Sequence, residues 1–267
     1  MRKFVALMMF SGVAVLAAPT QATILDDFNS GTIVTDFLFD DALDTQIPDA
    51  VNSAAGGLSF DSDSDNDNVV TNGSGELDAS GKDNTAFGSN YVDIPGINGG
   101  RVIGLFDVAW AFDESVYDSG QDEEFRLTLV TNDPRSTFVT GEIFFKRIST
   151  TEVELVGNAV GTGSDDTPEV ILGSSGSLLT LLDVNLDADT LELFYSTDDG
   201  ASFTSAGTGV LDPSRGVESV RLVINEDYVD DSLLIDRFAV SHIVPEPTAF
   251  GMMTSLLIVI AARRQCQ

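Results

Sequence analysis

The stretch LELFYSTDDGASFTSAG, residues 191–207, places two extended segments on either side of a polar turn. In the first segment Leu191, Leu193 and Tyr195 stand at every second position, and a period of two puts them on one face of a β-strand. Asp198-Asp199-Gly200 follows, and its glycine supplies the positive φ that a tight hairpin turn needs. The stretch therefore predicts a strand, a turn and a second strand.

The same period of two recurs along the chain, whereas helical periodicity is nearly absent between the two ends. Turn clusters rich in Gly, Asn, Asp and Ser separate the segments, a spacing typical of a sandwich or a barrel. We predict one all-β domain over residues 23–243, folded as an antiparallel two-sheet jelly-roll β-sandwich. The other predicted strands cover residues 108–112, 125–129, 142–148, 153–156, 169–172, 177–184, 220–224 and 233–240.

Three stretches resemble parts of the concanavalin A-like lectin/glucanase sandwiches. Residues 191–207 resemble a strand–turn–strand unit of those domains, and ESVRLVINEDYVDDSLLIDRFAVSH, residues 218–242, resembles their closing strands. In such domains the last strand pairs near the first, and ILDDFNSG, residues 24–31, fits a first strand and turn. The resemblance implies the jelly-roll fold but no activity, because this kind of fold carries many unrelated functions.

Catalytic chemistry finds little support in the sequence. Glucanases of the concanavalin-like type carry a compact Glu-x-Asp-x-(x)-Glu motif on a strand, and glycoside hydrolysis needs two suitably placed carboxylates. Residues 122–124 (DEE) lie in a predicted turn, and residues 152–154 (EVE) lack the central acid. His242 is the single histidine, so a His-rich zinc site is excluded and any Ser-His-Asp triad would depend on it. We predict that the chain is not an enzyme and that His242 ends a strand.

Residues 1–22 have the pattern of a secretory signal peptide. Arg2 and Lys3 form a basic start, and an uncharged apolar segment follows over residues 4–18. Thr20-Gln21-Ala22 places small residues at the −3 and −1 positions of a cleavage site, and cleavage after Ala18 is an alternative. The pattern predicts that the chain is exported through the general secretion machinery.

Residues 244–267 form a tail of three parts. Pro245-Glu246-Pro247 is rigid and non-helical. An uncharged, mostly apolar run follows over residues 248–262, and Arg263 and Arg264 come directly after it. As a helix the run reaches roughly 22 Å at about 1.5 Å per residue, which is short for a bilayer core of roughly 30 Å. The two arginines can extend it by snorkelling, and they favour a cytoplasmic C-terminus. The alternative is a buried core helix.

This tail and the signal peptide together resemble the PEP-CTERM proteins, which are substrates of the membrane protease-transpeptidase exosortase. The resemblance rests on Pro245, Glu246 and Pro247, on the apolar run, and on Arg263 and Arg264 in that order. It implies a Gram-negative-type bacterium, often one that makes exopolysaccharide. It also implies a precursor anchored in the inner membrane by a single helix, processed near the PEP motif, and a product at the cell surface or in the extracellular matrix.

The balance of charge excludes some partners. The chain carries 43 Asp and Glu against 13 Lys and Arg, a formal net charge of −30. Nucleic-acid binding needs Lys and Arg to displace counterions, so we expect no nucleic acid, and docking on an anionic membrane surface is disfavoured as well. The single cysteine, Cys266, lies in the tail, so no disulfide can form within the domain.

An acidic stretch places carboxylates at alternate positions, as a calcium loop does. Calcium takes roughly six to eight oxygen ligands, and its EF-hand loop needs a glycine at position 6 and a glutamate at position 12. Counted from either of the first two aspartates, position 12 is Asn72 or Ser74, so an EF-hand is not expected. A looser Ca²⁺ site and a solvated acidic surface loop, within residues 56–81, both remain open. The candidate ligands are Asp61, Asp63, Asp65 and Asp67.

Exposed aromatic rings would be platforms for sugars. Trp110 lies in phase with Val108 and Phe112 in an apolar strand, so we expect it in the core, and Tyr195 likewise. Tyr117, in the polar stretch DESVYDSGQDEE, is the better candidate for an exposed ligand-binding ring. The sequence thus predicts an exported, non-catalytic surface protein with a carbohydrate-binding or adhesive role and extracellular polysaccharide as a partner. A purely structural matrix protein and a glycan-processing enzyme are the alternatives.

Overall fold

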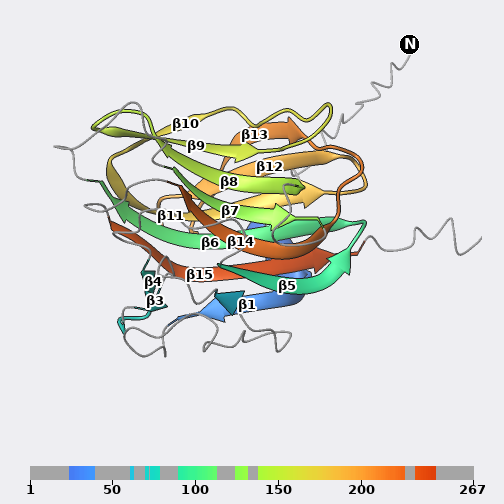
Figure 1. Cartoon of the computed structure of the whole chain (residues 1–267), viewed down its shortest axis with the longest axis horizontal. Coiled ribbons are helices and arrows are strands. Elements are labelled where there is room, and N and C mark those ends of the chain that lie inside the picture. Colours follow the sequence, from blue (N-terminus) through green and yellow to red (C-terminus); the bar gives the residue numbers. More distant parts are fainter. Residues whose placement is uncertain are drawn as a thin grey trace, which may run out of the picture.

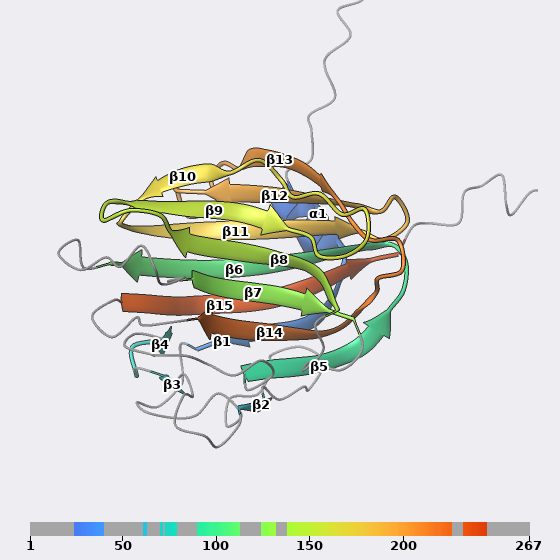
Figure 2. The same ribbon diagram turned by 45° about the horizontal axis from the view of Figure 1, so that its top comes forward.

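The computed structural model describes residues 24–39, 61–62, 70–71, 73–78, 90–112, 124–131, 138–225 and 232–244. These residues form two β-sheets packed face to face, with one short helix, α1, outside them (Figures 1 and 2). Every strand pair in both sheets is antiparallel. The predicted all-β sandwich of two antiparallel sheets is therefore confirmed, and the jelly-roll type stays a prediction.

The first sheet has eight strands in the order β13-β12-β11-β6-β15-β4-β3, and β1 also pairs with β15. β6 and β11 form its long centre, and residues along both strands stay in register from Arg101↔Asn185 to Ala111↔Ser175. The bounds are β1 Thr32–Leu38, β3 Val70–Thr71, β4 Leu77–Asp78, β6 Arg101–Ala111, β11 Ser175–Asn185, β12 Thr190–Ser196, β13 Thr204–Val210 and β15 Ser232–Ile243.

The second sheet has seven strands in the order β10-β9-β8-β7-β14-β5-β2. Its bounds are β2 Asp61–Ser62, β5 Asn90–Ile97, β7 Glu124–Val130, β8 Val139–Arg147, β9 Glu152–Asn158, β10 Val170–Gly173 and β14 Val217–Asn225. Figure 2 shows β8, β9 and β7 lying across the layer formed by β6, β11 and β15. All the strands predicted from period two are present, with most boundaries shifted by one to three residues; β6 begins seven residues earlier than predicted, and β1 was not predicted.

The core lies between the two sheets and is built from the alternate positions of each strand. Trp110 is 6 % exposed, and its ring centroid lies 5.6 Å from that of Phe145 in the opposite sheet. The indole Nε1 donates to the carbonyl oxygen of Gly173 at 3.1 Å, which satisfies the one polar atom of a ring placed in an apolar interior. The expectation that Trp110 is a core residue is confirmed, and Tyr195 packs against the same core.

The predicted first strand at residues 24–31 is wrong, because α1 spans Ile24–Ser30. Ile24 and Phe28 stand four residues apart, lie on one face of this helix and are both buried against the outer face of the eight-stranded sheet. Arg101 of β6 fixes the helix from the side, since its guanidinium contacts Asp27 at 3.0 Å and Asp183 at 2.5 Å.

The predicted pairing of the last strand near the first is confirmed. β1 runs antiparallel to β15, with Thr32 opposite His242 and Leu38 opposite Arg237. His242 lies one residue before the end of β15, as expected for a residue at a strand end, and its Nε2 is 3.0 Å from the carbonyl oxygen of Gly99. The two ends of the folded domain therefore lie side by side.

The predicted hairpin of residues 191–207 is present as β12, a turn and β13. Asp199 and Gly200 have φ values of 53° and 80°, so the glycine supplies the left-handed conformation that was expected of it. The carboxylate of Asp198 accepts hydrogen bonds from the Ser196 hydroxyl at 2.6 Å and from the Ser202 backbone N–H at 2.9 Å. These bonds close the turn.

Two further differences from the sequence-based prediction concern short or irregular strands. β5 (NYVDIPGI) was not predicted, since Pro95 and Gly96 interrupt its pattern. The segment 56–81, predicted as a surface loop, contains the two-residue strands β2, β3 and β4. Within the described ranges, no helix is long and apolar enough to cross a membrane.

Candidate functional site at the loop end of the sandwich

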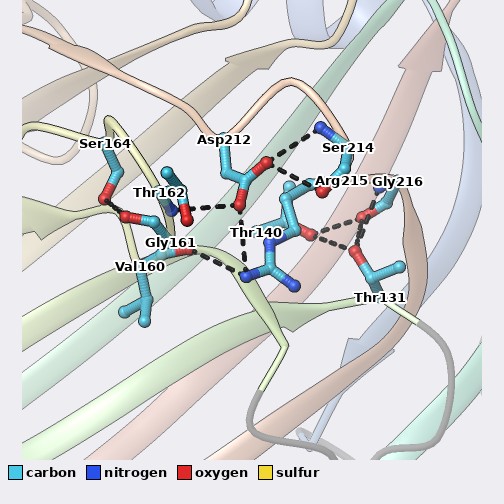
Figure 3. Close-up of polar contacts among 10 residues, drawn as sticks. All are labelled: Thr131, Thr140, Val160, Gly161, Thr162, Ser164, Asp212, Ser214, Arg215 and Gly216. Atoms are coloured by element: carbon cyan, nitrogen blue, oxygen red, sulfur yellow. Dashed lines mark hydrogen bonds and ion pairs between the residues drawn. The ribbon is translucent and has the colours of Figure 1, made fainter.

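Three connections meet at one end of the sandwich and form what we call the loop-end site. They are the residues that follow β9 (Ala159–Thr167), those between β13 and β14 (Leu211–Gly216), and Thr131 and Phe138 on either side of the β7–β8 connection. Figure 3 shows the polar contacts that join the first two connections. The site is thus built from segments of both sheets.

Asp212 joins the two longer connections through its carboxylate. Oδ1 accepts hydrogen bonds from the backbone N–H of Ser214 at 3.0 Å and from its hydroxyl at 2.7 Å. Oδ2 accepts from the backbone N–H of Thr162 at 3.1 Å (Figure 3). The bonds from Ser214, more than the nearby Arg215 charge, lower the pKa of this carboxyl below its usual value, because they favour the ionised form.

Gly161 lets the two connections approach each other closely. Its φ is 144°, a conformation that residues with side chains rarely adopt, and a Cβ at this position would lie 2.6 Å from the Cβ of Asp212. A larger residue would therefore push the segment away from Asp212 and break the bond from Thr162. The Ser164 hydroxyl closes the same turn by donating to the carbonyl oxygen of Gly161 at 2.9 Å.

Arg215 occupies the centre of the site. Its Nη2 lies 3.5 Å from Oδ2 of Asp212 and 3.4 Å from the carbonyl oxygen of Val160 (Figure 3). The guanidinium carbon lies 4.8 Å from the ring centroid of Phe138, within the range of a cation–π contact. The side chain is 9 % exposed, and its buried Nε has no hydrogen-bond partner. The guanidinium thus joins the β13–β14 connection to Val160 and to the Phe138 ring.

Phe138 is the exposed ring of the site. It is 52 % exposed, whereas the next residue, Val139, is 6 % exposed and belongs to the core. Val160, whose carbonyl oxygen lies 3.4 Å from Nη2 of Arg215, is 38 % exposed. Phe138 is thus a half-exposed aromatic side chain in contact with the guanidinium of Arg215.

A buried polar group fixes the base of the site to β14. The hydroxyls of Thr131 and Thr140 lie 2.8 Å apart and both contact the carbonyl oxygen of Gly216, the bond from Thr131 being 2.7 Å long. Thr131 Oγ1 also accepts a hydrogen bond from the Gly216 N–H at 3.0 Å. These bonds hold the residue that follows Arg215, so the site rests on a rigid support.

A second polar cluster lies nearby, on the face of the seven-stranded sheet that points away from the core. Glu142 is 1 % exposed, and its two oxygens accept hydrogen bonds from Thr128 and from Asn158, both at 2.9 Å. Burial raises the pKa of Glu142, and the charge of Arg126 opposes that rise. Because both of its oxygens are occupied, we interpret this carboxylate as structural. It anchors Asn158, from which the loop-end site begins.

A small cavity lies between the two sheets. The cavity there has a volume of about 10 Å³ and is lined mainly by apolar side chains, among them Phe39, Leu77 and Phe238. This is the space of one water molecule without polar partners. It is a packing gap of the core.

The sites predicted from the sequence lie almost wholly outside the described residues. This holds for Tyr117, for Asp63, Asp65 and Asp67, for the motif Pro245, Glu246 and Pro247, and for Arg263 and Arg264. Asp61 is described only by its backbone, which pairs with Tyr91 of β5. Among the described residues, no group of three or more His, Cys, Asp or Glu side chains could hold a metal ion. The Ca²⁺ site therefore stays a prediction.

The loop-end site was not predicted, although part of its signal is visible. Asp212-Pro213-Ser214 is a turn-forming triplet, and its internal bonds could have been expected. The contacts of Asp212 with Thr162 and of Arg215 with Val160 join positions about fifty residues apart in the chain, and no local pattern indicates them. Phe138 stands alone in its stretch, so nothing marked it as exposed rather than buried.

Comparison with known proteins adds the following. No protein-family model matches the chain, and no curated protein matches it. Among solved structures, the ligand-binding domain of botulinum neurotoxin serotype D in complex with N-acetylneuraminic acid matches with a TM-score of 0.46 and 9 % identity, over 83 % of this chain and 50 % of that one. The serotype G binding domain matches with a TM-score of 0.45 and 8 % identity, over 84 % and 51 %.

A carbohydrate-binding module of another source also matches. It is the CBM2 module of the evolved Dit of Lactobacillus casei BL23 phage J-1, with a TM-score of 0.41 and 11 % identity, over 79 % of this chain and 99 % of that one. The chain spans about half the length of the neurotoxin binding domains that it matches. These likenesses are too distant to carry an argument about what this chain binds.

Proposed function

We propose that this chain is an exported, non-catalytic surface protein whose β-sandwich, of the concanavalin-like jelly-roll type, binds carbohydrate at the loop-end site. The secretion machinery would export it by the signal peptide of residues 1–22. The tail of residues 244–267 would anchor the precursor in the inner membrane until exosortase processes it near Pro245-Glu246-Pro247. The product would then act at the cell surface or in the extracellular matrix of a Gram-negative-type bacterium.

The observation that carries the binding proposal is the half-exposed ring of Phe138 above the buried guanidinium of Arg215. Sugar rings offer an apolar face that can stack on an exposed aromatic ring. Arg215 is immobilised by Asp212 and Val160, so little conformational entropy remains to be lost when a ligand arrives.

The groups around the ring suit hydroxyl-rich ligands. Thr162 is exposed and its backbone N–H binds Asp212, and Ser164 lies two residues further on in the same turn. Hydroxyl groups both donate and accept hydrogen bonds, as sugar hydroxyls do. Val160 extends the apolar platform. A sugar could therefore stack on the platform and bond at its rim.

The electrostatics of the site support a binding role rather than hydrolysis. A glycosidase needs a carboxylic acid with a raised pKa to protonate the leaving oxygen. Asp212, the carboxylate beside Arg215, has its pKa lowered by the bonds from Ser214, and hydrogen bonds already occupy both of its oxygens. It is an acceptor with a fixed role, poorly suited to donate a proton.

The test is a screen of the full chain against an array of neutral and acidic oligosaccharides, followed by affinity measurements for the glycans that bind. We expect Phe138→Ala to weaken binding by about tenfold, roughly the 1.4 kcal/mol of a lost ring contact. Ile171→Ala is the matched control, because Ile171 is equally exposed, at 51 %, but lies on the edge strand β10. Equal affinities for both variants would refute the site, and silence of the folded chain across the array would favour a structural matrix protein.

A further inference from the structure

The chain leaves the folded domain at the same end that carries the loop-end site. β15 is paired up to its last residue, since Ile243 lies opposite Arg101, the first residue of β6. The bend before β6 follows directly on the end of β5, and Ile97 of β5 lies opposite Val217, the first residue of β14. Figures 1 and 2 show the arrowheads of β5 and β15 at one end of the sandwich.

Arg215 and Gly216 directly precede β14 and therefore stand at that end. A Cβ at Gly216 would lie 2.6 Å from Oδ1 of Asn98 and 2.8 Å from the carbonyl oxygen of Ile97, so the support of the site touches the bend before β6. Most of the exposed large hydrophobic side chains gather here too. They are Phe138, Val160, Val210 and Val244.

The tether between this end and the predicted membrane span is short. Four residues, Val244 to Pro247, separate the last paired residue of β15 from the apolar run that begins at Thr248. A fully extended chain covers at most about 3.5 Å per residue, so the strand end lies within about 18 Å of the start of that run. The eleven residues of β6, at about 3.3 Å each, put the opposite end of the sandwich roughly 35 Å further away.

We infer that the loop-end site faces the bilayer while the precursor is anchored, and that it becomes accessible to polymeric ligands only when processing releases the domain. The inference rests on the proposed function, because it takes the anchoring tail and the binding site from it. The short tether alone brings the site to the membrane. Attraction by lipid charge is not needed, and the carboxylates of this end, such as Asp187 and Asp189, would oppose it on anionic lipids.

The experiment compares two single cysteines in the full chain, placed in phosphatidylcholine vesicles in a Cys266→Ser background. Thr162→Cys lies in the loop-end site, and Thr151→Cys lies in the β8–β9 turn at the opposite end. Both threonines are exposed, and the hydrogen bond that each makes comes from its backbone N–H, which the substitution keeps. For each cysteine we measure the rate of reaction with a maleimide on a long polyethylene glycol, divided by the rate with a small maleimide.

We expect this ratio to be several-fold lower at Thr162→Cys than at Thr151→Cys. A Gly/Ser spacer of about 20 residues after Val244, which reaches roughly 25 Å as a random coil, should make the two ratios equal. Equal ratios without the spacer would overturn the inference, and so would a low ratio at Thr162→Cys that the spacer does not relieve. A chain that fails to float with the vesicles would refute the proposed anchoring itself, and this outcome is separate from the result of the glycan array.

Discussion

The pKa values of individual carboxylates shift in opposite directions in this acidic protein. Asp198 and Asp212 each accept hydrogen bonds from serines two to four residues further along the chain, and those bonds hold a turn together. The bonds from Ser196 and Ser202 lower the pKa of Asp198 to about 2, so it stays ionised in the folded domain. Acidic residues at such positions stabilise turns. This explains part of the high acidic content of the chain.

Asp107 is the opposite case. It stands on the outer face of β6, with Leu179 and Arg237 as its cross-strand neighbours. Partial burial, and then the charges of Asp236 and Asp199, raise its pKa to about 6. Arg237 lowers it only in part, because this guanidinium is engaged with both oxygens of Asp36 at 2.9 Å.

Asp107→Asn should therefore stabilise the domain at high pH and not at low pH. The folded-state pKa lies above the unfolded one, so the stability that the neutral carboxyl provides is complete below about pH 4 and is lost as the pH rises through 6. Asparagine keeps the neutral form at every pH. After a discount for partial exposure, we expect a gain of about 1 kcal/mol in the free energy of unfolding at pH 8.

Urea unfolding at pH 4 and pH 8 measures this gain. Asp165→Asn, at an exposed position of the same chain, controls for the loss of one negative charge from an acidic protein. A gain for Asp107→Asn that is no larger than that of the control at pH 8, or one that is equal at both pH values, would contradict the prediction.

At the scale of elements, alternation found most strands of seven or more residues and also β10, but it missed β1, β5 and the two-residue strands. β6, β11, β14 and β15 show period two because each has one face in the core. β5 escapes this pattern because Pro95 and Gly96 break it, and β2, β3 and β4 are too short to show a period. The pairing order of the strands depends on long-range contacts, which no window of the sequence contains.

The helix α1 was missed for a physical reason. Seven residues show only one i,i+4 pair, Ile24 and Phe28, which alternation can also produce. Tertiary contacts stabilise the helical conformation of this segment. Phe28 packs into the small cluster on the outer face of the eight-stranded sheet, and its carbonyl oxygen accepts a hydrogen bond from the Ser241 hydroxyl at 2.7 Å. The helix thereby covers β15, the strand from which the tail continues.

Phe28→Ala should lower the free energy of unfolding by about 3 kcal/mol, the usual cost of removing a fully buried ring. Phe28 is 1 % exposed, and Leu25 of the same helix is only partly buried, so Leu25→Ala is the control with a smaller expected loss of about 1 kcal/mol. Chemical unfolding of the full chain gives both values. Equal losses would mean that the helix is not fixed through Phe28.

At the scale of the whole molecule, the two predicted sorting signals adjoin elements of the sandwich that lie side by side. α1 begins two residues after the predicted signal-peptide cleavage site, and it packs beside β15, which ends just before the predicted sorting tail. Both processing steps would thus act at one region of the domain. The strand pairing of β15 continues to Ile243, so the PEP motif is the first stretch after the fold that a protease could bind in extended form.

Replacing Pro245, Glu246 and Pro247 by alanines should therefore stop processing without disturbing the domain. These residues come after Ile243, the last residue of the described pairing of β15, so we expect the sheets to be unaffected. We expect an unprocessed precursor that stays in the membrane fraction, seen as a larger band on an immunoblot of the native host. Thr248→Ala, just beyond the motif, is the control that should be processed normally. Normal processing of the alanine variant would refute the sorting role of the motif, and with it the release step on which exposure of the loop-end site depends.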